Sequence, residues 1–188
     1  MKKILLIFLF ASSAYAQYPS FTVDTVRYIR PADTTVYTSG DIVADSGGHY
    51  KYFTFSKIGE RAGARGQLTN VTVQMDTANA TNTTVKVRLF TVSDTTRLWA
   101  ALPVDNAVFQ SQFQMGAGYY TWIGDVAVTL TIFGTTAGGA TASEGTATCS
   151  LPYYLFDGKL RCIVIATGAF EPKDTGAFRV IVSANKQY

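Results

Sequence analysis

Apolar and polar residues alternate along two neighbouring stretches of the chain. The apolar members are Val71, Val73 and Met75 in the first stretch and Val85, Val87 and Leu89 in the second. A period of two places every apolar side chain on one face of a pleated strand. Residues 77–84 between the stretches are Asn, Ala and Thr. The pattern therefore predicts an antiparallel hairpin over Gln67–Val92, with one dry face and one wet face.

Further strand patterns must cover that dry face, because a lone hairpin is only marginally stable. Candidates with apolar or alternating residues are Phe21–Ile29, Val36–Tyr37, Tyr50–Phe55, Val126–Ile132 and Phe178–Val182. Leu151–Phe156 and Leu160–Ala166 flank Asp157-Gly158. Since Asp-Gly between apolar runs is typical of a two-residue turn, these runs are predicted to form a second hairpin.

The stretch Gly134–Thr148 differs from its surroundings, because Gly, Ala and Thr dominate it and Glu144 is its only charged residue. We expect a long loop or a pair of weak edge strands there.

The composition supports one all-β domain. The chain has 188 residues, of which 47% are hydrophobic and 15% charged, so the profile of a disordered chain is excluded. β-branched and aromatic residues are enriched, and no long helical pattern is present. The patterns amount to roughly eight to ten strands at the spacing of a sandwich. We predict an antiparallel β-sandwich, jelly-roll-like, over residues 17–188.

Residues 1–16 form an apolar leader ahead of that domain. Lys2 and Lys3 precede the apolar run Ile4–Phe10, and Ala14-Tyr15-Ala16 has the pattern of a cleavage site before Gln17. These features are typical of a bacterial secretory signal. The alternative is an uncleaved N-terminal arm that docks on a neighbouring subunit, since an exposed apolar arm would aggregate.

The charge balance argues against nucleic acid as a partner. The formal net charge is +3, and without Lys2 and Lys3 it is +1, from 14 basic and 13 acidic residues. Neutralising phosphates requires a clustered positive surface, which this sequence lacks. A membrane is expected as a transient partner only, in the case that the leader is an export signal.

The sequence offers little catalytic chemistry. Its single histidine, His49, lies in a Gly-rich stretch, and no G-x-S-x-G motif surrounds a serine. The acidic residues are scattered among apparent turns, where aspartates bond their own backbone. No zinc or EF-hand pattern is present. We expect no enzyme activity, no cofactor and no catalytic or metal-binding residues, and a loop calcium ion held by turn carboxylates stays open as an alternative.

Cys149 and Cys162 are candidates for a disulfide if the chain is exported. The predicted Asp157-Gly158 hairpin argues against the bond, because its register would place Cys149 opposite Ala166 and Cys162 opposite Tyr153. A bulge near Pro152 would change this register, so the disulfide stays open. As free thiols, the two residues would be small apolar groups.

Aromatic residues gather in two places and are candidates for an interface or ligand patch. They are Tyr119, Tyr120 and Trp122 in one stretch and Tyr153, Tyr154 and Phe156 in another. If exposed, such a patch suits sugar stacking or a protein interface. The alternative is that these side chains belong to the sandwich core.

Several segments also resemble a known group of proteins. Tyr28–Val43 reads YIRPADTTVYTSGDIV and is similar to the R-P-A-x-T-x-x-Y-x-x-G-D-V-V opening of structural proteins encoded in tailed-phage virion modules. Gly63–Val71 matches their Gly-rich step into a central strand. Arg88-Leu89-Phe90 and Asp105-Asn106-Ala107-Val108-Phe109 match two later segments. The secretory-type leader departs from that group.

The resemblance implies a non-enzymatic virion component. It would be a capsid decoration or a head- or fibre-associated subunit that forms homo-oligomers and contacts the major capsid protein or fibre and portal-region subunits. The expected location is the virion. The alternative hypothesis is an exported bacterial surface protein, namely a carbohydrate-binding or adhesin module that is secreted or held at the cell surface.

Overall fold

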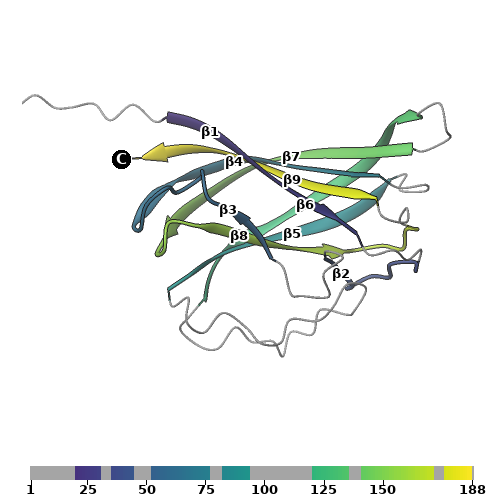
Figure 1. Cartoon of the computed structure of the whole chain (residues 1–188), viewed down its shortest axis with the longest axis horizontal. Helices are drawn as coiled ribbons and strands as arrows, with labels where there is room; N and C mark the ends of the chain where they lie inside the picture. Colours follow the sequence, from purple (N-terminus) through teal and green to yellow (C-terminus); the bar gives the residue numbers. More distant parts are fainter. Residues whose placement is uncertain are drawn as a thin grey trace, which may run out of the picture.

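A computed structural model of the chain describes residues 20–30, 35–44, 52–76, 82–93, 120–135, 141–171 and 176–187. These residues form nine strands and no helix (Figure 1). The strands are β1 (Ser20–Ile29), β2 (Ile42–Val43), β3 (Phe53–Phe55), β4 (Ala64–Asp76), β5 (Thr83–Val92), β6 (Tyr120–Thr135), β7 (Thr141–Leu155), β8 (Leu160–Ala166) and β9 (Ala177–Gln187). All their pairings are antiparallel, so the predicted all-β class is confirmed.

The strand order is β1-β9-β4-β7-β6-β5-β8-β2, and β3 also pairs with β8. The pairings are nested along the chain. β5 pairs with β6, β4 with β7, β2 and β3 with β8, and β1 with β9. Successive nested pairs belong alternately to two layers. The first layer is β1-β9-β4-β7, and the second is β6-β5-β8 with β2 and β3. Two layers built by such wrapping define a jelly roll, as the sequence predicts.

Both predicted hairpins are wrong. β4 pairs with β7 and β9, and β5 pairs with β6 and β8, so the two strands lie in different layers. Their apolar faces bury each other across the interior instead of forming one shared face. Likewise, Asp157-Gly158 connects β7 of the first layer to β8 of the second. Gly158 has φ +76° there, and the Asp157 carboxylate accepts a bond of 2.5 Å from Arg161 Nη2.

The expectation of a loop or weak edge strands over Gly134–Thr148 is also wrong for most of that stretch. Thr141–Thr148 is the first half of β7, which lies between β4 and β6 in the sheet. Small residues are favourable there because β6 and β7 approach each other closely. A side chain on Gly145 would place its Cβ 2.1 Å from the backbone oxygen of Thr129.

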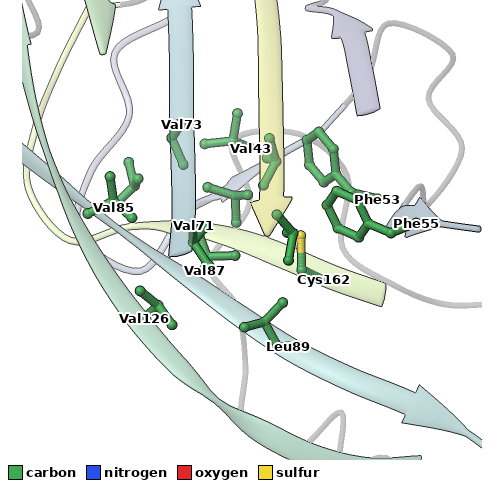
Figure 2. Packing of buried hydrophobic residues seen from close by; sticks show 14 of the residues in the cluster. Val43, Phe53, Phe55, Val71, Val73, Val85, Val87, Leu89, Val126 and Cys162 are labelled. Carbon is green, nitrogen blue, oxygen red and sulfur yellow. The ribbon is translucent and has the colours of Figure 1, made fainter. Parts of the chain in front are cut away.

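The core fills the space between the layers. Figure 2 shows side chains of β4 and β5 pointing into this shared interior, together with Phe53 and Phe55 from β3 and Cys162 from β8. A second, smaller cluster of buried apolar residues contains Ile42, Ala44, Phe90, Val92, Ile163 and Ile165. On β8, Cys162 and Val164 belong to the main core, and Ile163 and Ile165 belong to this second cluster. Apolar residues therefore occupy both faces of β8, and all seven of its residues are buried.

β6 joins the two layers. Its residues 120–130 pair with β5, and residues 131–135 pair with β7. At this fork, β6 leaves one layer for the other, and the close contact at Gly145 allows it to do so.

We predict that Gly145→Ala lowers the free energy of unfolding by about 2 kcal/mol, because a backbone oxygen cannot move away cheaply from the new methyl group. Urea unfolding followed by circular dichroism measures the change. Gly134→Ala is the matched control, since no atom lies within 4 Å of its Cβ position. Equal effects of the two substitutions would contradict the close approach at the fork.

Candidate functional site

Polar side chains cover the outer face of the first layer and satisfy one another. Thr72 and Thr146 hydroxyls lie 2.8 Å apart, Gln67 Nε2 donates to Ser150 Oγ at 2.7 Å, and Gln74 Nε2 donates to Glu144 Oε2 at 2.9 Å. Against this background, large exposed apolar side chains mark candidate contact surfaces. In the described part of the chain they are Phe21, Val23, Ile29, Val36, Trp122, Ile132, Tyr154 and Phe156.

Three of these residues lie on the outward face of β1, where Thr25 and Arg27 separate Ile29 from the other two, and they are here called the edge stripe. The side chains of Phe21, Val23 and Ile29 are 62%, 45% and 37% exposed. β1 ends the sheet order and pairs with β9 alone among the described strands. Its opposite face supplies Val26 and Tyr28 to the main core. β1 is thus apolar on both faces, whereas an edge strand needs only one.

Among the described strands, β1 has no backbone pairing with the second layer, and side-chain contacts connect it to that layer instead. Asp24 is 7% exposed and accepts bonds of 2.8 Å from the backbone nitrogens of Thr25 and Lys57. The Tyr28 hydroxyl donates to the Tyr52 carbonyl at 2.7 Å, and its ring stacks on Phe53 with centroids 4.2 Å apart. The edge stripe is therefore held on a rigid strand.

A second exposed apolar group is Trp122 on β6. Its side chain is 43% exposed, with the Arg88 guanidinium 4.8 Å from the ring centroid. Arg88 Nε and Nη2 donate to Asp125 at 2.8 and 2.7 Å. This bidentate pairing raises the pKa of Arg88. Phe90 meets the Trp122 ring edge-on at 6.0 Å. The indole is thus held in place by neighbours on β5.

An open hollow of about 450 Å³ lies at the fork of β6 and β7. Thr129, Thr131, Glu144, Gly145 and Thr146 line it, and we call it the fork hollow. Its lining residues are polar apart from Gly145, and none is basic. The sequence pattern does not predict the fork hollow, because the hollow arises only where β6 changes layers.

The structure separates the predicted aromatic residues. Tyr120 and Trp122 lie on β6 beside β5, whereas Tyr154 lies on β7 beside β4. Tyr154 is 48% exposed and meets Phe156 edge-on at 5.1 Å. Tyr153 is buried, and its hydroxyl donates to the Ile58 carbonyl at 3.4 Å. Tyr119, His49 and the leader 1–16 lie outside the described residues. Sequence reasoning missed the edge stripe, although apolar residues on both faces of Phe21–Ile29 signal it.

The two cysteines are free thiols on opposite layers. Cys162 on β8 pairs with Phe53 and Leu89, so the register that the predicted hairpin implied for it is wrong. Burial raises the pKa of Cys162 well above its ordinary value, because a thiolate is unfavourable in an apolar core. Burial also raises the pKa of the half-buried Cys149.

The described residues hold no group of three or more His, Cys, Asp or Glu side chains placed to bind a metal ion. Within the same ranges, no helix is long and apolar enough to cross a membrane.

No family model matches the chain, and no curated protein matches its sequence. Among solved structures, one from Desmodium yellow mottle tymovirus aligns with 100% of this chain and 97% of that chain. The TM-score is 0.27 and the sequence identity is 11%. A similarity of this degree supports no conclusion about function.

We predict that iodoacetamide modifies Cys149 in the native protein and leaves Cys162 unmodified. Thiolates are the reactive species, so the raised pKa of Cys149 makes its labelling slower than that of a free cysteine near pH 8 and faster as the pH rises. Mass spectrometry of peptides measures both sites, with Cys149→Ser as the control. In denaturant without a reductant both thiols should react, and failure of both to react would reveal a disulfide.

Proposed function

We propose that this chain is a non-enzymatic structural subunit of a virion. It decorates the capsid or belongs to the head or fibre region, and it assembles through protein–protein contacts. Its partners are further copies of itself and other virion proteins, namely the major capsid protein or subunits of the fibre or portal region. The resemblance of Tyr28–Val43 and the later segments to tailed-phage structural proteins supports this assignment.

The edge stripe is the observation that carries the proposal. Phe21, Val23 and Ile29 present apolar surface on a strand whose partner on one side is β9. An isolated soluble protein gains nothing from such a stripe, because exposed apolar edges promote aggregation. A subunit that packs this stripe against a neighbour gains free energy on the order of 25 cal/mol per Å² of apolar surface removed from water.

The surroundings of the edge stripe also suit an interface. Thr25 and Arg27 lie on the same outward face of β1 and are exposed. They lie between Val23 and Ile29, so the outward face mixes apolar side chains with an arginine, a residue that is enriched at protein–protein contact surfaces. The strand is held by Asp24 and Tyr28, so little conformational entropy is lost when a partner binds.

We expect mass spectrometry of purified virus particles from the source of this gene to detect the chain as a structural component. The double substitution Phe21→Ser with Val23→Thr should reduce its incorporation into particles about tenfold, because both side chains are exposed and contribute mainly to the contact. Stability should change by less than about 0.5 kcal/mol, as for other surface positions.

The matched control is Tyr154→Ser, which removes an exposed aromatic side chain from a different strand. It should be incorporated at the wild-type level. Absence of the chain from particles would refute the virion assignment. Normal incorporation of the double variant would show instead that the edge stripe is not the contact surface.

A further inference from the structure

The outer surface along β6 carries features that the assembly role does not use. Trp122 lies at one end, and the fork hollow lies at the other. Between them, the outward residues Asp125 and Ala127 pair with Arg88 and Lys86 of β5. Trp122 and Thr129 are seven residues apart, so the surface extends roughly 20 Å along an extended strand. We call it the β6 surface.

Trp122 supplies a rigid stacking platform. The Arg88 guanidinium lies over one face of the indole and Phe90 packs against it at a steep angle, so the ring is restricted and a ligand must use the remaining exposed part, 43% of the residue. The face of an aromatic ring is electron-rich and attracts partly positive C–H groups, such as those of a sugar ring. Because the indole is already ordered, stacking costs little side-chain entropy.

The Arg88–Asp125 ion pair beside Trp122 supplies planar hydrogen-bonding groups. Arg88 and Asp125 are joined by two bonds, so their charges offset each other at the surface. Asp125 remains partly exposed, with 36% of its side chain accessible. A carboxylate oxygen has more than one acceptor direction, so it accepts a ligand hydroxyl without losing Arg88.

The fork hollow supplies hydroxyl groups. Thr146 is bonded to Thr72, the Thr131 hydroxyl donates to the Glu144 carbonyl at 3.3 Å, and Thr129 lies 3.2 Å from the Thr84 hydroxyl. Each hydroxyl has one donor and two acceptor positions, so these contacts leave capacity for a ligand. The Glu144 carboxylate and the lack of a basic lining residue disfavour an anionic ligand.

We propose that the β6 surface binds a linear neutral oligosaccharide. One sugar ring stacks on Trp122, and a ring further along the chain bonds to the threonine hydroxyls of the fork hollow. This site is separate from the edge stripe and does not depend on the virion assignment. On an assembled particle it would attach the particle to a polysaccharide surface.

Isothermal titration calorimetry of the purified full chain tests the site. The probes are hexasaccharides of β-1,4-linked glucose, α-1,4-linked glucose and β-1,4-linked N-acetylglucosamine, each at millimolar concentration. At least one should bind. Trp122→Ala should weaken that binding by about tenfold or more, the equivalent of one lost anchor contact. Trp122→Phe, which keeps an aromatic ring, should restore part of it.

Thr131→Val and Thr146→Val should each weaken binding about threefold, since each removes one neutral hydrogen bond. Tyr154→Ala is the control and should bind as wild type. Circular dichroism of every variant shows whether the fold persists. No binding by any of the three probes, or equal binding by wild type and Trp122→Ala, would overturn the proposal. Loss of binding in Trp122→Ala with unchanged incorporation into particles would separate this site from the assembly surface.

Discussion

Burial of one apolar face on each of β4 and β5 is the constraint on which the rest of the structure depends. Val71 and Val73 need a dry partner surface, and so do Val85 and Val87. Side by side in a hairpin, the two strands would leave one broad apolar face uncovered. In the structure they lie in opposite layers and cover each other. Because β4 and β5 lie in opposite layers, each pairs with strands from other parts of the chain, and these pairings form the nested pattern of the jelly roll.

The two sides of the sandwich are closed by different means. On one side β6 passes from one layer to the other, its ladder with β7 joins the layers, and the absence of a side chain at Gly145 permits the close approach. On the other side β1 is held by side chains, chiefly Asp24 and Tyr28. Because side chains rather than a ladder hold β1 on the second layer, β1 remains an edge strand with apolar residues facing outward. Where β6 passes between the layers, a polar hollow remains. The proposed assembly surface and the proposed glycan surface are consequences of these two closures.

The strands and the fold class could be predicted from the sequence, whereas their partners could not. Alternation shows which side chains share a face, but it does not show whether the next strand lies beside that face or opposite it. Asp157-Gly158 illustrates the same limit, because a tight turn serves equally well between neighbours and between layers. Tyr153 and Tyr154 are adjacent, and only the observed register shows that the first is buried and the second exposed. The small residues of Thr141–Thr148 suggested a loop because their role, close approach of two backbones, depends on a distant strand.

Cross-strand nuclear Overhauser effects in the labelled protein test the central claim most directly. The account predicts contacts between the backbone protons of Val71 and Val182 and between those of Val85 and Val128, which are paired in the structure. It also predicts no backbone contact between β4 and β5. A ladder of contacts joining Val71, Val73 and Met75 to Val85, Val87 and Leu89 would contradict the account, because it would place the two strands side by side in one sheet.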